Sequence, residues 1–331
     1  MKKKSPNTKI ILGIVGGFII ALVMIPVLFA LFTLIIRPEI ENVPTQILDI
    51  QEELEIESLD SYYITVYRSK TLDFQTIEFE RYVIGVVAAE MPALFELDAL
   101  RAQAIAARTY ALRILEHNEY ILDTVTHQVF LDDDQLRERW GSDFDIHYAT
   151  IEEAVVSTHG IVLMYDDELI TPMFFAMSNG ATENSEDVFS TQRPYLRSVA
   201  STGYEDRDDF AAIETFTIDE IKEAFNDSFI TADTITVLEY SEGGNVSKIT
   251  IGASDYTGRD VREILGLRSA AFSISSKEGG ITFTTYGHGH GVGMSQHGAN
   301  AMARNGYDYV EILQHFYQNV LLVEKNFING E

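Results

Sequence analysis

The sequence predicts an α+β protein: a single N-terminal transmembrane helix followed by a mixed extracytoplasmic domain with a smaller inserted α+β lobe. Three observations support this fold class. Residues 10–36 form a long uncharged run, residues 98–115 repeat apolar side chains at the helical period, and short segments from residue 61 onward are rich in aromatic and β-branched residues. The pattern of residue types then changes over residues 205–283, which we expect to form the inserted lobe.

The first predicted element is a membrane anchor. Residues 10–36 comprise 27 residues without a charge, and a bilayer core about 30 Å thick needs roughly 20 apolar residues in a helix. The alternative is a cleaved signal peptide, which has an apolar region of about 7–15 residues and a small-x-small cleavage site. Here the run is longer, and Leu28 stands two positions before Ala30. We therefore expect an uncleaved anchor.

Charge gives the orientation and excludes classes of partner. Four lysines occur in residues 1–9, which the positive-inside rule places in the cytoplasm. The rest of the chain is then outside a cell membrane that it crosses once, beginning with an acidic linker at residues 37–60. All 51 acidic residues lie after residue 38, and the whole chain has a formal charge of −27. This balance disfavours nucleic acid and anionic lipid as partners. There is no cysteine, so disulfides and thiolate metal sites are excluded.

The main domain is expected to combine residues 61–204 with residues 284–325. Residues 61–66 read as a strand, and residues 82–91 as a short helix that Pro92 ends. Residues 98–115 are the clearest helix, with Asp98 as its expected N-cap. One apolar face of this helix contains Leu100, Ala104, Ala107, Ala111 and Ile114.

Later segments complete the expected architecture. Residues 161–178 read as a hairpin with an acidic turn at Asp166 and Asp167. Within the lobe we expect helices near residues 218–225 and 257–266. Two further helices follow at residues 295–304 and 309–319. The second begins with a capping box, because Asp308 precedes Glu311 by three residues.

The first candidate for chemistry is Glu90. Seven of the eight residues before it are apolar and the eighth is Gly85. Desolvation and the negative end of the helix dipole both raise the pKa of a carboxyl in that position, so Glu90 could act as a general acid. The alternative is a structural glutamate held by Arg101 or Arg108.

Two loops are further candidates. A polar turn contains Ser178, Asn179, Gly180 and Glu183, residue types that are also common in simple turns. The second loop, residues 287–298, reads GHGHGVGMSQHG. Its histidines (His288, His290 and His297) suit zinc, but glycine at every second position from 287 to 293 favours close contact between backbone and a ligand. A Ser–His hydrolase using Ser295 lacks the strand–elbow–helix context of that class.

The motifs together resemble one known family. VVAAEMP, ALRAQAIAARTYAL, FFAMSNGATENSEDV, PYLRSV, GHGHGVGMSQHGANAMA and EILQHFYQNV occur in this order between residues 62 and 320. In this order they resemble the stage II sporulation protein D family, which is related to amidase enhancer domains.

The resemblance implies a lytic transglycosylase that cleaves denuded peptidoglycan strands to 1,6-anhydro-muramic acid ends during engulfment in endospore formation. It implies Glu90 as the acid, glycan already stripped by a partner amidase, and further membrane proteins of the engulfment machinery as partners. The expected glycan-binding residues are Arg108, Ser178, Asn179, Gly180, Glu183, His288, His290, Gly291, Ser295 and Gln296. The alternative function is a non-catalytic glycan-binding module that stimulates an amidase.

One stretch departs from the family pattern. Some relatives carry a zinc site with cysteine and histidine ligands after the long helix, whereas residues 123–135 here contain His127 and three aspartates, Asp132 to Asp134, without cysteine. We therefore expect no metal and no cofactor, with weak divalent-cation binding at the aspartates as the remaining possibility.

Overall fold

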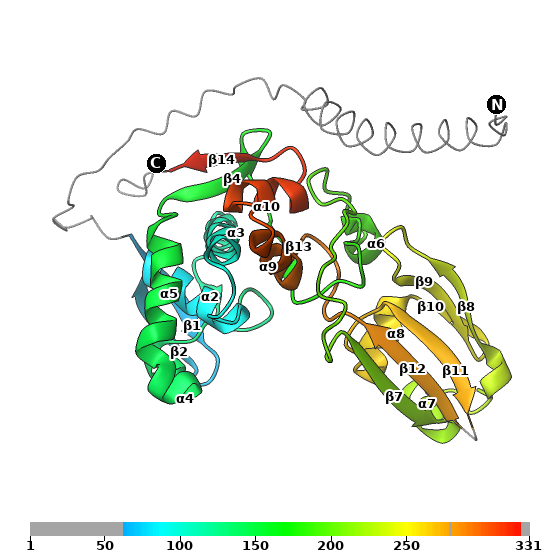
Figure 1. The fold of residues 1–331 in the computed structure, drawn as a ribbon. Coiled ribbons are helices and arrows are strands. Elements are labelled where there is room, and N and C mark those ends of the chain that lie inside the picture. Colours follow the sequence, from blue (N-terminus) through cyan, green and yellow to red (C-terminus); the bar gives the residue numbers. More distant parts are fainter. Residues whose placement is uncertain (1–61, 278–279, 326–331) are drawn as a thin grey trace, which may run out of the picture. The chain divides into compact units, whose positions relative to one another are not determined.

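The computed structural model describes residues 62–277 and 280–325 (Figure 1). The predicted cytoplasmic tail, transmembrane helix and acidic linker (residues 1–9, 10–36 and 37–60) fall outside these residues. Within the described ranges, no helix is long and apolar enough to cross a membrane. The domain itself is mixed α+β, as the sequence predicts.

The domain opens with a small sheet that leads directly into the helix carrying Glu90. Strands β1 (Tyr63–Arg68) and β2 (Asp73–Glu78) pair antiparallel, and β3 (Ile121–Leu122) lies parallel to β1 on its other side. Helix α2 (Phe79–Glu90) follows, with the side chain of Glu78 accepting hydrogen bonds from two N–H groups of its first turn. The helix ends where Met91 becomes extended, the conformation that a following proline favours.

Helix α3 (Leu97–Leu115) is the centre of the main hydrophobic core. It packs against α2, α5 (Phe144–Val156), α9 (Gln296–Arg304), α10 (Tyr309–Phe316) and β4 (Ile161–Tyr165). The predicted single apolar face was too narrow, because alanines around the helix are also buried, which is typical of a core helix. Asp98 is not the N-cap: the cap is Glu96, and Asp98 lies in the first turn beside Arg101.

The predicted hairpin at residues 161–178 is correct only in its first half. Strand β4 turns through Asp166 and Asp167, both at positive φ, into β5 (Glu168–Leu169). The chain then leaves the hairpin, and β6 (Phe174–Phe175) pairs parallel with β13 (Met294–Ser295). On the other side of β4 lies β14 (Leu321–Glu324). Long-range pairing thus replaces the second half of the expected hairpin.

The helices that remain in the main region frame these strands. Helix α4 (Asp133–Trp140) and the 3-10 turn η1 (Gly141–Asp143) lead into α5. Helix α6 (Ser185–Phe189) follows the polar turn at residues 178–184. Ser295 caps α9, and Asp308 and Glu311 form the predicted capping box of α10.

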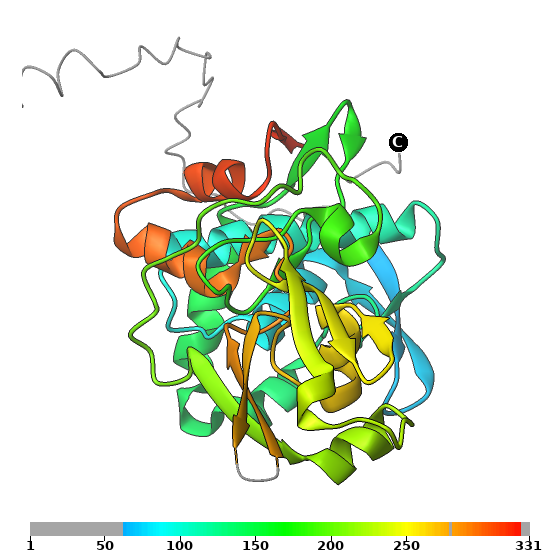
Figure 2. The same ribbon diagram turned by 90° about the vertical axis from the view of Figure 1, so that its right-hand side faces the viewer.

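The lobe residues form two sheets and a hydrophobic core of their own (Figures 1 and 2). One sheet has the order β11 (Phe272–Lys277), β12 (Gly280–Tyr286), β7 (Ala211–Thr217), and the other β10 (Ser254–Tyr256), β9 (Val246–Ile251), β8 (Ile235–Tyr240). The shorter elements are α7 (Ile218–Ala224), η2 (Ala232–Thr234) and α8 (Gly258–Leu265). As predicted, Thr257 caps α8, and Gly266 ends it in the left-handed conformation.

Candidate active site

Glu90 is the last residue of α2 and is half-buried. Burial raises the pKa of its carboxyl above the usual range. Hydrogen bonding from the Val129 backbone and the charge of Arg139 act in the opposite direction without cancelling the effect. Arg139 also donates to the carbonyls of Ala88 and Ala89, which satisfies acceptors at the end of α2. The environment therefore favours a proton on Glu90 at a higher pH than an exposed glutamate allows.

The side-chain amide of Gln296 also faces Glu90 and lowers its pKa somewhat. Gln296 Nε2 is buried, yet it makes no well-formed hydrogen bond to any described residue. The contact with Glu90 is therefore long or poorly aligned. Such contacts often tighten when substrate binds, so Gln296 is well placed to hold the carboxyl during a reaction.

Glu90 lines a groove of about 570 Å³, within the volume range of about 300–1,000 Å³ typical of ligand pockets. The groove joins segments from distant parts of the chain, and this is where Glu90 meets the glycine–histidine loop. Among the lining residues that the structure describes, Glu90 is the only carboxylic acid. Its walls contain Glu90, Tyr110, Val125, Thr126, His127, Gln128, Pro172, Met173, Phe174, Phe175, Ala176, Phe189, Arg262, His288, Gly289 and His290.

The glycine–histidine loop approaches residues 173–183 very closely. His288 and Met177 exchange backbone hydrogen bonds, and Glu183 N–H donates to the Gly291 carbonyl. The glycines at 287, 289, 291 and 293 all have positive φ, a region that side chains rarely adopt. At Gly293 an added Cβ would lie 2.0 Å from the Met173 carbonyl oxygen. These glycines therefore allow the loop to pack closely on its neighbours, but only Gly289 of the four lines the groove; Gly291 lies against the Glu183 side chain instead.

Both nitrogens of the His290 ring are hydrogen-bonded to backbone groups of the protein. Its Nδ1 accepts from Val292 N–H, so Nε2 carries the proton and donates to the Phe174 carbonyl. The ring packs between Phe175 and Phe189, and burial lowers its pKa to about 4. Both nitrogens are thus committed, which corrects the expectation that His290 hydrogen-bonds sugar. It presents a neutral ring edge to the groove.

The other two histidines of the loop have different surroundings. His288 is exposed at the groove and its pKa is lowered by burial and by nearby arginines, so it remains available to a ligand. His297 packs against Phe95 and Tyr204, and its pKa falls to about 4 because it is desolvated. Among the described residues, no three His, Cys, Asp or Glu side chains gather as a metal site would require. A zinc site built on the three histidines is therefore not formed in this fold.

Two of the three aspartates at residues 132–134, Asp132 and Asp133, have structural partners. Asp132 caps α4 and accepts from Arg68 at 2.8 Å, while Asp133 pairs with Arg81 at 2.6 Å. Their carboxylates stabilise the start of α4 against β1 and α2, which argues against the cation site considered for them.

Two serines predicted to bind glycan are buried instead. The Ser178 hydroxyl bonds the Ser201 carbonyl at 3.0 Å and the Tyr204 hydroxyl at 2.5 Å. Ser295 is fully buried, where its Oγ accepts from Gly298 N–H as the cap of α9. Both hydroxyls are engaged by the protein and neither residue lines the groove, so the structure gives no support to the predicted contacts with sugar.

Arg108 is also structural. Its side chain is fully buried and donates to both carboxylate oxygens of Glu80, at 2.8 and 2.6 Å. The remaining donors reach the carbonyls of Val155 and Ile161. The structure therefore gives no support to the predicted contact of Arg108 with glycan. The alternative in which Arg108 holds Glu90 is not observed, since its partner is the glutamate at the opposite end of α2.

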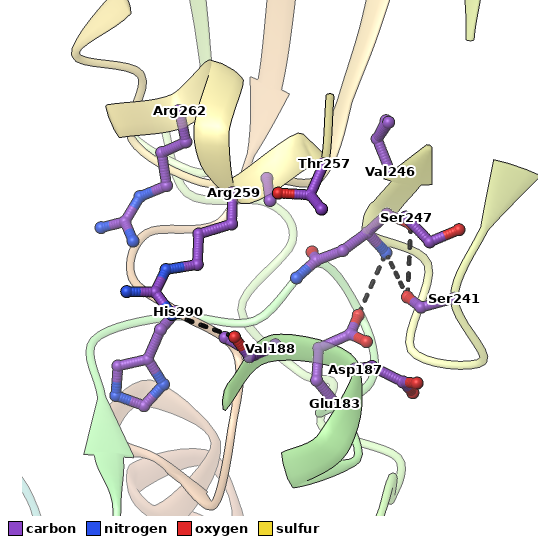
Figure 3. A pocket seen from close by; sticks show the side chains of 12 residues that line it. Glu183, Asp187, Val188, Ser241, Val246, Ser247, Thr257, Arg259, Arg262 and His290 are labelled. Atoms are coloured by element: carbon purple, nitrogen blue, oxygen red, sulfur yellow. Dashed lines mark hydrogen bonds between the residues drawn. The ribbon is translucent and has the colours of Figure 1, made fainter. Parts of the chain in front are cut away.

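Glu183 lies in a separate small cavity of about 30 Å³ between the polar turn and the lobe (Figure 3). Its Oε1 accepts from Asn245 N–H at 3.0 Å, whereas Oε2 is buried without a well-formed bond to any described residue. Burial raises the pKa of this carboxyl as well. Asn179 lies against Gly244 of the lobe, and Gly180 has open space around it. Neither Asn179, Gly180 nor Glu183 is among the residues that line the groove of Glu90.

Comparisons with known proteins agree with the sequence motifs. A family model described as "SpoIID: Stage II sporulation protein" matches residues 67–165. The chain is 40% identical over 270 residues to stage II sporulation protein D of Bacillus amyloliquefaciens, covering 79% of this chain and 78% of the relative. It is 38% identical over 276 residues to the Bacillus subtilis (strain 168) protein of that name, covering 80% of each. The chain belongs to the stage II sporulation protein D family.

The chain is also similar to a protein of a second group. An amidase enhancer of Bacillus subtilis (strain 168) is 27% identical over 295 residues, covering 72% of this chain and 40% of that protein. The family assignment confirms the resemblance drawn from the motifs. The similarity to this amidase enhancer agrees with the predicted relation to amidase enhancer domains.

Other residues of the groove were not predicted, because their signals in the sequence are weaker. Gln128 is 2% exposed and lines the groove, yet its Nε2 has no partner among the described residues. Tyr110 is on α3, and the alanine pattern of this helix predicted only close packing against its neighbours. Arg262 reaches the groove from α8 of the lobe. Only the tertiary structure brings these three side chains toward Glu90.

Proposed function

We propose that this protein is a membrane-anchored peptidoglycan lytic transglycosylase that cleaves denuded glycan strands to 1,6-anhydro-muramic acid ends during engulfment. The observation that carries the proposal is Glu90, the single carboxylic acid of the described groove lining, with a raised pKa. Ordinary glycosidases use two carboxyl groups, one for the leaving group and one for water or covalent attack. A groove lined by one acid fits a reaction that needs no water.

The reaction uses Glu90 twice. The protonated carboxyl first gives its proton to the glycosidic oxygen as the bond from that oxygen to C1 of muramic acid breaks. The C6 hydroxyl of the same sugar then bonds to C1 and returns its proton to Glu90. Intramolecular attack is favoured because effective molarities reach about 10⁵ M or more. The acid ends in its starting state, and the product carries the 1,6-anhydro ring.

The rest of the groove supplies binding surface. Phe174, Phe175 and Phe189 line it together with the neutral edge of His290, and apolar and aromatic walls with few polar groups are typical of ligand sites. The Gln128 side-chain amide adds an N–H donor, at Nε2, that makes no hydrogen bond to any described residue. His288 adds an exposed ring at the same wall. We expect these groups to hold the sugar against Glu90.

The test is Glu90→Gln in the domain that follows the anchor, assayed by mass spectrometry of products from denuded glycan. The amide keeps the shape of the side chain but cannot donate a carboxyl proton, so anhydro products should fall by about 10²-fold or more while glycan binding persists. Glu183→Gln is the matched control, because that acid is also buried with a raised pKa but lies outside the groove. Full product yield from Glu90→Gln would refute the mechanism.

The second candidate is a glycan-binding module that stimulates a partner amidase, and the amidase enhancer among the relatives favours it. A pure binder has no need of a protonatable acid in the groove. A purified domain that accelerates an amidase on intact peptidoglycan, yet forms no anhydro ends from denuded strands, would favour this alternative.

Membrane anchoring by residues 10–36 is part of the proposal and rests on the uncharged run and the lysines before it. The full chain should sediment with membranes, and deletion of residues 1–36 should release it. A full chain that remains in the soluble fraction would contradict the anchor.

A further inference from the structure

Arg262 is a half-buried arginine whose guanidinium has no partner among the described residues. It extends from α8 of the lobe and lines both the small cavity and the groove of Glu90. Figure 3 shows it beside Arg259, with no dashed line ending on it. No hydrogen bond or ion pair joins the Arg262 guanidinium to any residue that the structure describes, although a guanidinium has five N–H donors.

The acid next to Arg262 on α8 is already engaged. Glu263, the adjacent carboxylate, pairs with Arg259 at 2.8 Å, and Arg259 also donates to the Val188 carbonyl. Burial lowers the pKa of Arg262, and the charge of Arg262 in turn lowers the pKa of His288 and His290. The lobe side of the groove therefore has an uncompensated positive charge, in a chain whose formal charge is −27.

Arg262 is not the partner of the proposed acid. The cation that acts on Glu90 is Arg139, which approaches the end of α2 from α4. The groove thus holds a protonatable acid and, separately, a free guanidinium. A partly desolvated charge is costly unless an opposite charge meets it. No described carboxylate forms an ion pair with Arg262, so its guanidinium is available to an anionic ligand.

We propose that Arg262 binds the lactyl carboxylate of a muramic acid residue and thereby selects glycan that has lost its stem peptides. This inference rests on the proposed function, because it takes peptidoglycan glycan as the occupant of the groove. The lactyl carboxyl is free and negative only where no peptide is attached. In a peptide-bearing strand it is a neutral amide, which cannot accept the paired charge-assisted hydrogen bonds that arginine makes with a carboxylate.

The experiment measures binding, so it does not depend on catalysis. In the Glu90→Gln background, calorimetry compares denuded glycan with the same glycan after its lactyl carboxyls are converted to methylamides. We expect the carboxylate form to bind about 10-fold to 100-fold more tightly, the usual range for a hydrogen-bonded charge. Arg262→Gln should abolish this preference, and Arg262→Lys should retain part of it, since lysine keeps the charge without the planar fork.

Arg259→Gln is the matched control, because it removes the same charge from the same helix but does not line the groove. In the enzyme with Glu90 intact, Arg262→Gln should raise KM for denuded glycan with little change in kcat. Equal binding of the two glycans before mutation, or a preference that survives Arg262→Gln, would overturn the inference. Full cleavage by Glu90→Gln alongside an Arg262-dependent preference would refute the acid and leave the carboxylate site standing.

Discussion

Two arginines that are shielded from solvent differ in their hydrogen-bond partners: Arg108 in the helical region around α2 and α3, and Arg262 at the lobe edge formed by α8. Arg108 is enclosed in the helical region and all its neighbours are acceptors: the Glu80 carboxylate and two backbone carbonyls. Arg262 is half-buried at the lobe edge, and its guanidinium is hydrogen-bonded to no described residue. A saturated guanidinium stabilises the fold, whereas an unsaturated one beside a groove is available to a ligand. Charge and burial alone therefore do not distinguish a structural arginine from a binding one.

The largest expected effect tests this contrast directly. Arg108→Met should lower the free energy of unfolding by about 3–5 kcal/mol, because it leaves the Glu80 carboxylate partly buried without its partner. Arg262→Met should change it by no more than about 0.5–1 kcal/mol. Urea denaturation measures both. If adding Glu80→Gln to Arg108→Met recovers part of the loss, the stranded charge is the cause; equal losses for the two arginine variants would break the comparison.

A second prediction asks whether the two regions are stabilised separately. An added Cβ at Gly258 would lie 2.1 Å from the Val246 carbonyl oxygen in the lobe, and one at Gly85 would lie 2.3 Å from Phe130 Cε2 in the helical region. Each Gly→Ala change should cost about 1–3 kcal/mol through overpacking. Because the regions have separate cores, hydrogen exchange should accelerate mainly in β8 and β9 for Gly258→Ala and in α2 and α3 for Gly85→Ala. Identical exchange patterns would show that the two regions unfold together.

The smallest expected effect is the loss in free energy of unfolding that results from burying the Glu90 carboxyl. Its pKa is raised in the folded state from an ordinary value near 4.5, so the folded protein binds more protons than the unfolded chain just above that pH. Stability from this group is present below pH 4.5 and is lost as pH rises through the folded pKa. Glu90→Gln should therefore be more stable than the parent at pH 7, by less than about 1 kcal/mol, and the gain should vanish near pH 4. Thermal unfolding across this range measures it, and a variant less stable at pH 7 would contradict the desolvation argument.

Local signals made several elements predictable. Pro92 and the apolar residues before Glu90 predicted a helix over residues 82–91, and α2 ends one residue earlier, at Glu90. The Asp308–Glu311 capping box, the Thr257 and Gly266 ends of α8 and the Asp166–Asp167 turn were equally readable. Each depends on residues within a few positions of one another, so the sequence contains the whole interaction.

Other outcomes depend on residues far apart in the chain. The pairing of β6 with β13 joins segments about 120 residues apart and ended the expected hairpin. Glu80 and Glu90 are both on α2, about 15 Å apart at 1.5 Å per residue, and only helix packing decided that Arg108 meets the first. The same packing turned Ser178 and Ser295 into buried structural hydroxyls and brought Arg262 into the groove.

The sequence by itself determined the family, the helix that carries Glu90 and the glycine pattern of the loop beside it, because these follow from local backbone preferences and contiguous motifs. The tertiary structure alone decided which polar side chains are satisfied and which are left with free donors. Hydrogen-bond satisfaction is a property of neighbours in space. It separates Arg108, Ser178 and His290, which are engaged by the protein, from Gln128, Gln296 and Arg262, whose donors are free in the described chain.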